Sequence, residues 1–264
     1  MIGVFDSGLG GLSVWREIVQ VLPQEAIWYY ADSAYCPYGN RPEEEVIAYS
    51  HRITQYLLKK GCQLIVVACN TATGLAIDIL RDTYEIPFVG MEPDIKPAAQ
   101  HTHSGTIGVL ATGNTLQGAH FLQAKSRLEQ EIDILTTDAK GLVGLVEQGL
   151  LEGEATTSLL KSYIEPMLEK GADHLVLGCS HYPFLMGPIQ EIIQGKAIAV
   201  DPAPAVARQT QLLFQQHAIQ SGSSTPTEYH FVTSAKVHML KAFVQQVASQ
   251  EVVFKSRFWK DPTA

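Results

Sequence analysis

Short apolar runs alternate along the chain with amphipathic segments and turns rich in small residues. In the first half, runs at Ile2–Phe5, Ile27–Tyr30 and Leu64–Cys69 predict strands. These runs are apolar at nearly every position, which is typical of strands covered on both faces. Helical spacing follows each run, and the resulting order predicts an α/β unit with a parallel sheet. Helices are expected from Leu12 to Val19, Glu43 to Lys60 and Thr71 to Thr83, with a further strand from Ile86 to Val89 and a boundary at Met91-Glu92-Pro93.

The second half repeats this order. The strand-forming triplet Ile2-Gly3-Val4 recurs as Ile107-Gly108-Val109, and a Lys-Gly pair precedes Cys69 and Cys179 by the same spacing. Repeated order of this kind indicates a duplicated unit. Helices are expected near 117–129, 141–150 and 155–170, with a strand at 175–177 before Cys179. The carboxyl-terminal part of the chain is expected to form a helix at 205–216, a polar loop at 221–226, a strand at 229–232 and a helix at 235–247.

The duplication predicts the fold class: an α/β protein of two pseudo-symmetric parallel-sheet domains that face each other across a central active-site cleft. Parallel sheets bind ligands at the carboxyl ends of their strands. Each domain would therefore present one cysteine, Cys69 or Cys179, to the cleft. We expect Asn70 or Thr71 to cap the helix after Cys69, so that the thiol lies at a helix N-terminus. Taken alone, Cys69 would be interpreted as an inert cysteine at a strand end.

Composition and charge narrow the function classes. The chain has 264 residues, 46% hydrophobic and 17% charged, as expected of an ordinary globular protein. A net charge of −8 argues against nucleic-acid binding, which needs a basic face. Neither a secretory signal nor an apolar run of membrane-spanning length is present, so we expect no membrane partner. The four cysteines lack a disulfide or C-x-x-C pattern and are expected as reduced thiols in the cytosol.

Two cysteines on opposite sides of a cleft allow few kinds of chemistry. A substrate-filled cleft would hold the sulfurs too far apart for a disulfide. A zinc site would require further ligands besides the cysteines, and only His181 lies near one of them in sequence, so no metal site is predicted. Gly8, Gly10 and Gly11 do not fit the dinucleotide-binding spacing. If one thiolate removes a proton from a stereocentre and the opposite thiol returns one, configuration inverts. The pattern therefore predicts a racemase.

Five motifs together resemble bacterial glutamate racemase. They are GVFDSGLGG at 3–11, PYG at 37–39, ACNTA at 68–72, LVEQG at 145–149 and GCSHYP at 178–183. The resemblance covers nearly the whole chain. It implies a cofactor-independent interconversion of L- and D-glutamate that supplies D-glutamate for peptidoglycan. It also implies a cytoplasmic homodimer with glutamate as its small-molecule partner.

The resemblance assigns catalytic roles to five residues. Cys69 would deprotonate D-glutamate and Cys179 L-glutamate, while Asp6 and His181 would assist the two thiols and Glu147 would lie near the second one. For Asp6 the alternative is a simple Asx turn. For His181 it is a capping or packing role, and for Glu147 a solvated position on a helix.

The resemblance also implies a set of uncharged substrate-binding groups. They are Ser7, Pro37, Tyr38, Gly39, Asn70, Thr71, Thr112, Thr115 and Ser180. Asp32 precedes the PYG segment and either orients it or only forms the turn. The family commonly has threonine where this chain has Ser180, which retains the hydroxyl but puts the fine selection of substrate in question.

The resemblance implies that the tail folds back onto the first domain. The expected domains are residues 1–92 with about 207–264, and residues 93–206. Two other functions stay open. One is a racemase for aspartate or another acidic or cyclic amino-acid derivative. The other, from a different class, is a two-domain protein that binds a carboxylate without chemistry.

Overall fold

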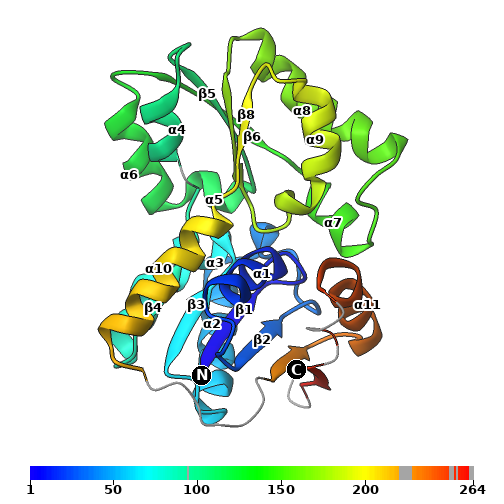
Figure 1. Cartoon of the computed structure of the whole chain (residues 1–264). Coiled ribbons are helices and arrows are strands. Elements are labelled where there is room, and N and C mark those ends of the chain that lie inside the picture. The colour runs from blue at the N-terminus through cyan, green and yellow to red at the C-terminus, as the bar shows by residue number, and fades with distance from the viewer. Residues whose placement is uncertain (94, 220–227, 250–252, 254, 262–264) are drawn as a thin grey trace. The chain divides into compact units, whose positions relative to one another are not determined.

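The apolar strands of the two halves build two separate parallel sheets (Figure 1). The structure is a computed structural model that describes residues 1–93, 95–219, 228–249, 253 and 255–261. One unit comprises Met1–Met91 and Ala203–Ala264, and the other comprises Glu92–Pro202. The polar loop expected at 221–226 lies outside the described residues. Within the described ranges, no helix is long and apolar enough to cross a membrane.

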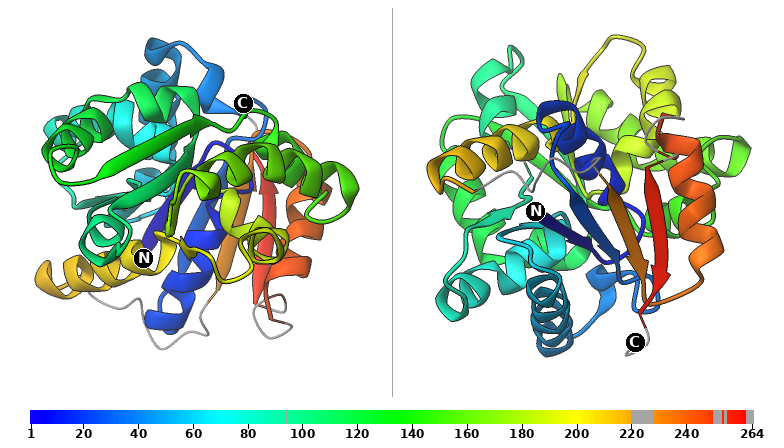
Figure 2. Two further views of the ribbon diagram at one scale, coloured as in Figure 1. Left: turned by 90° about the horizontal axis from the view of Figure 1, so that it is seen from above. Right: turned by 60° about the horizontal axis from the view of Figure 1, so that its bottom comes forward.

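The first unit is organised around a sheet whose strands lie in the order β10-β9-β2-β1-β3-β4. The strands are β1 Ile2–Asp6, β2 Ile27–Ala31, β3 Leu64–Val67, β4 Phe88–Gly90, β9 Tyr229–Thr233 and β10 Ser256–Lys260. Every pairing is parallel, and β9 joins the sheet by pairing with β2 (Figure 2). All residues of β1 and β3 are buried, which explains why their sequences are apolar runs rather than alternating ones.

Helices cover the first sheet on both faces. They are α1 Leu12–Val21, α2 Glu43–Lys59, α3 Asn70–Thr83, α10 Ala203–Gln216 and α11 Val237–Val247, with a 3₁₀ turn η1 at Tyr38–Asn40. Phe5, Ile65 and Val67 belong to the same core cluster as buried residues of α2 and α3. Helix α1 packs against α10, so the carboxyl-terminal part of the chain contributes to the core of the first unit.

The second unit has a sheet of order β6-β5-β7-β8. Its strands are β5 Thr106–Ala111, β6 Asp133–Asp138, β7 His174–Gly178 and β8 Ile198–Val200. Its helices are α4 Ile95–His101, α5 Gly113–Gln117, α6 Ala119–Leu128, α7 Leu142–Glu147, α8 Glu154–Glu169 and α9 Met186–Ile193, with a 3₁₀ turn η2 at Tyr182–Leu185. The two central strands, β5 and β7, are buried along their whole length.

The predicted duplication is confirmed in both topology and register. The order β2-β1-β3-β4 in one sheet corresponds to β6-β5-β7-β8 in the other. Val4 pairs with Val66, and Val109 pairs with Val176. These partners each lie three residues before a cysteine, Cys69 or Cys179. The two thiols therefore occupy the same position in two copies of one unit.

The strand and helix predictions erred where exposure interrupts the apolar pattern. Strands β6, β8 and β10 were not predicted, because each lies at a sheet edge and contains polar or exposed residues that leave only a short apolar run. The helices α4 and α9 were also missed. The helix expected over 117–129 is confirmed as α6, whereas the short helix α5, which meets it at an extended Gly118, was not predicted.

Candidate active site

In the first unit, Asp6 and Ser7 lie where β1 ends, and both are buried. The Asp6 carboxylate accepts a hydrogen bond from the Gly8 N–H at 2.9 Å. The Tyr29 hydroxyl donates to the Gly8 carbonyl at 2.7 Å, so the turn is fixed from both sides. Asp6 thus forms the Asx turn that was its alternative assignment. Its assistance to a thiol stays a prediction.

Cys69 lies just after β3, at the start of α3. The thiol itself caps the helix, because the Ala72 N–H donates to Sγ at 3.5 Å. The prediction that Asn70 or Thr71 caps this helix is therefore wrong. Both residues already belong to α3, and the extended backbone of Cys69 aims its side chain at the first turn. A sulfur at a helix N-terminus is in an environment that favours the thiolate.

Asn70 and Thr71 are 4% and 3% exposed at the beginning of α3. No described residue gives a hydrogen-bond partner to Oδ1 or Nδ2 of Asn70. Buried polar groups are normally satisfied, and an exception in a native fold calls for an explanation such as a ligand. Asn70 is therefore the predicted binding residue with the most direct support from the structure of the first unit.

The loop between β2 and α2 carries Pro37, Tyr38 and Gly39. The Tyr38 hydroxyl donates to Oδ2 of Asp32 at 2.5 Å. Burial, with the negative charge of Asp32 beside it, raises the pKa of Tyr38 well above its usual value, so the hydroxyl keeps its proton and remains a donor. Asp32 therefore does more than form a turn, since it holds the aromatic ring of the PYG segment in place. Earlier in this loop, Cys36 places its sulfur 3.9 Å from the Ser7 hydroxyl.

In the second unit, Cys179, His181 and Glu147 form a chain of polar contacts. Cys179 Sγ lies 3.7 Å from His181 Nδ1, and His181 Nε2 lies 2.7 Å from Glu147 Oε1. A carboxylate can only accept a hydrogen bond, so Nε2 of His181 carries the proton. In the neutral ring, Nδ1 is then a hydrogen-bond acceptor. The arrangement can take a proton from the thiol and stabilise the resulting imidazolium through Glu147.

Three hydroxyl side chains of the second unit follow the ends of strands β5 and β7. The Ser180 hydroxyl lies 3.3 Å from His181 Nδ1, so it shares that nitrogen with the thiol. Thr112 follows β5 directly, and its hydroxyl lies 2.9 Å from that of Thr115. Val4 and Val109 are equivalent in the two copies, and Ser7 and Thr112 each lie three residues after them. Thr112 therefore holds the position in the second copy that Ser7 holds in the first.

The predicted residues gather into two groups. The first group lies at or after the carboxyl ends of the adjacent strands β1, β2 and β3 of the first unit: Asp6, Ser7, Pro37, Tyr38, Gly39, Cys69, Asn70 and Thr71. In the second unit, Thr112, Thr115, Cys179, Ser180 and His181 follow β5 and β7, and Glu147 ends α7. Sequence reasoning missed Arg52, which lies in the middle of α2 without a motif around it and contacts Asp32.

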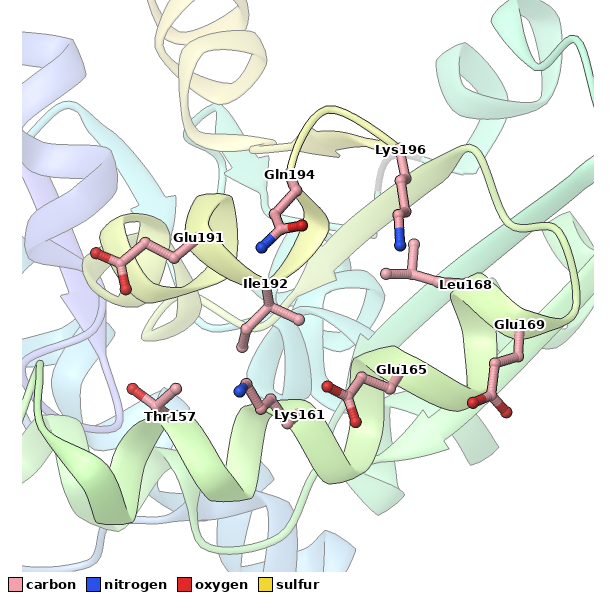
Figure 3. A pocket seen from close by; sticks show the side chains of 9 residues that line it. All are labelled: Thr157, Lys161, Glu165, Leu168, Glu169, Glu191, Ile192, Gln194 and Lys196. Carbon is pink, nitrogen blue, oxygen red and sulfur yellow. The ribbon is translucent and has the colours of Figure 1, made fainter.

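A separate hollow of about 600 Å³ lies between α8 and α9 (Figure 3). None of the predicted site residues lines it. Side chains of opposite charge, uncharged polar side chains and apolar ones line it together: Thr157, Lys161, Glu165, Leu168, Glu169, Glu191, Ile192, Gln194 and Lys196. The hollow is a surface feature of the second unit and not the place where Cys179 lies.

Comparison with known proteins identifies the family. A sequence model of the Asp/Glu/hydantoin racemases matches residues 2–210. The chain belongs to this family. A glutamate racemase from Herpetosiphon aurantiacus is 45% identical over 233 residues, which are 88% of this chain and 92% of that relative.

Solved structures agree with this family. A glutamate racemase from Escherichia coli, in complex with L-glutamate and the activator UDP-MurNAc-Ala, has a TM-score of 0.86 and 30% identity, covering 98% of this chain and 96% of the other. A glutamate racemase isoform from Bacillus anthracis has a TM-score of 0.84 and 30% identity, covering 93% and 92%. The resemblance seen in the five motifs is therefore confirmed.

Proposed function

We propose that the protein is a glutamate racemase that interconverts L- and D-glutamate without a cofactor and supplies D-glutamate for peptidoglycan and hence for cell-wall biogenesis. The observation that carries this proposal is the register-equivalent placement of Cys69 and Cys179 in two copies of one unit. A two-base racemisation needs a proton-transfer group on each face of the α-carbon, and two like groups in matched positions meet this need, because each half-reaction is the other in reverse.

The reaction moves one proton off the α-carbon and another onto it. With D-glutamate, the Cys69 thiolate takes the α-proton, and the Cys179 thiol gives its proton to the opposite face of the carbanion. With L-glutamate the two sulfurs exchange roles. Each turnover leaves one sulfur protonated and the other ionised, with no net consumption of protons.

The neighbours of each thiol suit it to this exchange. The N-terminus of α3 stabilises a Cys69 thiolate through its N–H groups, while His181 and Glu147 assist Cys179. Asp6 would assist on the Cys69 side from the turn after β1. The two glutamate carboxylates and the ammonium would be held by the uncharged groups Ser7, Pro37, Tyr38, Gly39, Asn70, Thr71, Thr112, Thr115 and Ser180. Hydrogen bonds to charged groups are strong enough to replace ion pairs in this role.

Exchange with solvent tests the proposed function. Incubation with each enantiomer of glutamate in deuterated water should place deuterium at the α-carbon as racemisation proceeds. Aspartate, tested in parallel, should exchange far more slowly. Faster exchange of aspartate would favour the aspartate racemase, and failure to exchange either amino acid would favour a protein that only binds carboxylates.

We also propose that the enzyme is a cytoplasmic homodimer, as the family resemblance implies. Sedimentation at several concentrations should give twice the mass of the chain. A single species with the mass of one chain would contradict this assembly.

A further inference from the structure

The substrate loop, residues 32–42, joins β2 to α2 and carries Pro37, Tyr38 and Gly39. Such a connection needs anchoring side chains if it is to present binding groups in one conformation. Asp32, at the first position of the loop, is one anchor. Its side chain is fully buried and accepts a hydrogen bond from the Tyr38 hydroxyl. A fully buried carboxylate is stable only with a compensating partner.

Arg52 of α2 is that partner. Its Nη2 donates to Oδ1 of Asp32 at 2.8 Å, while Tyr38 occupies Oδ2. Burial raises the pKa of Asp32, and the Tyr38 hydrogen bond and the Arg52 charge act in the opposite direction. Arg52 therefore favours the ionised form, which alone can accept both hydrogen bonds.

Arg52 also contacts the loop at a second point. Its guanidinium carbon lies 5.0 Å from the ring centre of Tyr35 and 5.4 Å from that of Tyr49, within cation–π range. Tyr35 belongs to the substrate loop and stacks on Tyr49 of α2 at 4.4 Å. One arginine thus connects α2 to the loop through Asp32 and through Tyr35.

We infer that Arg52 is a positioning residue for glutamate binding, which acts through Asp32 and Tyr38 to fix the Pro37-Tyr38-Gly39 segment. This inference rests on the proposed function of the loop. Arg52 acts on the loop and not on the reacting atoms. Its loss should therefore weaken binding of substrate and transition state alike, which raises KM and leaves kcat unchanged.

Kinetics of three variants test this role. Arg52→Gln should raise KM about tenfold, the equivalent of one charge-assisted hydrogen bond, with kcat within about twofold. The ratio kcat/KM should fall by the same factor for D- and L-glutamate, because the enantiomers have equal free energy in water. With kcat unchanged, both KM values should rise by that factor. Arg52→Lys keeps the charge but not the planar fork, and should show a smaller rise. Arg81→Gln, on α3 and away from the loop, is the matched control and should behave as the wild type.

An unchanged KM in Arg52→Gln, with or without a fall in kcat, would overturn the inference. If Arg52→Gln does not fold, an unchanged KM in Arg52→Lys overturns it equally. The wild-type assay separates this inference from the proposed function. An inactive wild type refutes the racemase, whereas an active wild type with a normal KM in the variants refutes only the role of Arg52.

Discussion

Asn70 shows the conflict between stability and function at the scale of one residue. Both polar atoms of its side chain are buried, and no described residue offers them a hydrogen bond. Leaving such groups unsatisfied costs about 1–3 kcal/mol. This cost is explained if glutamate supplies the missing partner.

Asn70→Ala should therefore weaken binding without weakening the fold. We expect KM to rise about tenfold, as for the loss of one hydrogen bond to a charged ligand, and the free energy of unfolding to stay equal or increase. Steady-state kinetics and urea unfolding measure the two effects. A variant that unfolds more readily but binds glutamate normally would show that Asn70 has only a structural role.

At the scale of elements, the site depends on the close approach of α1 to the ends of β1 and β3. Gly11 lies at this approach, where an added Cβ would be 2.6 Å from the Asp6 Cβ and 2.9 Å from the Ala68 Cβ. Gly74, inside α3, has no heavy atom within 4 Å of such a Cβ outside its own neighbours. The two glycines therefore provide opposite tests of one substitution.

Gly11→Ala should destabilise the protein by about 1–3 kcal/mol, because the extra methyl overpacks a buried contact. It should also lower activity by displacing Asp6. Gly74→Ala should stabilise by about 0.5–1 kcal/mol, since alanine is the better helix former. Chemical denaturation of both variants measures the difference, and equal stabilities would show that the approach at Gly11 can relax.

Much of the fold was predictable at this scale, for a definite physical reason. Buried central strands such as β3 and β7 are apolar at nearly every position, so they stand out in the sequence, whereas the edge strand β6, Asp133–Asp138, is partly exposed and polar at most of its positions. The same limit applies to the site. Cys69 and Cys179 follow recognisable strands, while Arg52 acts through a contact with Asp32 that no local pattern indicates.

At the scale of the whole molecule, the stability of the second unit should depend on pH through Asp173. This residue precedes β7 and holds the turn before β5. Burial alone would raise its pKa, but hydrogen bonds from His174, Thr102 and the backbone N–H groups of Ser104 and His103 outweigh it and lower the pKa well below the usual 3.8. A carboxylate with a lowered pKa contributes stability above its unfolded pKa and loses it as pH falls through the folded value.

Asp173→Asn should therefore be less stable than the wild type by about 1–2 kcal/mol at pH 7, and the difference should shrink as pH falls below about 4. Asp82→Asn, at an exposed position of α3, is the control and should stay close to the wild type at each pH. Unfolding curves between pH 7 and pH 3 measure both. A constant difference for Asp173→Asn across this range would exclude the linkage.

Racemisation rates do not show which of the two thiols serves which enantiomer. Because L- and D-glutamate have equal free energy in water, kcat/KM must be the same in both directions for every variant. Loss of either cysteine therefore lowers both directions equally. Only an irreversible partial reaction can show which sulfur serves which enantiomer.

Elimination from a glutamate analogue with a leaving group on the α-nitrogen is such a reaction. Removal of the α-proton expels the group and gives an imine, which water hydrolyses to a keto acid, so one base is sufficient. Cys69→Ser should retain elimination from the L-analogue only, and Cys179→Ser from the D-analogue only. Keto acid formed from both enantiomers at similar rates by either variant would contradict the assignment of one thiol to each face of the α-carbon.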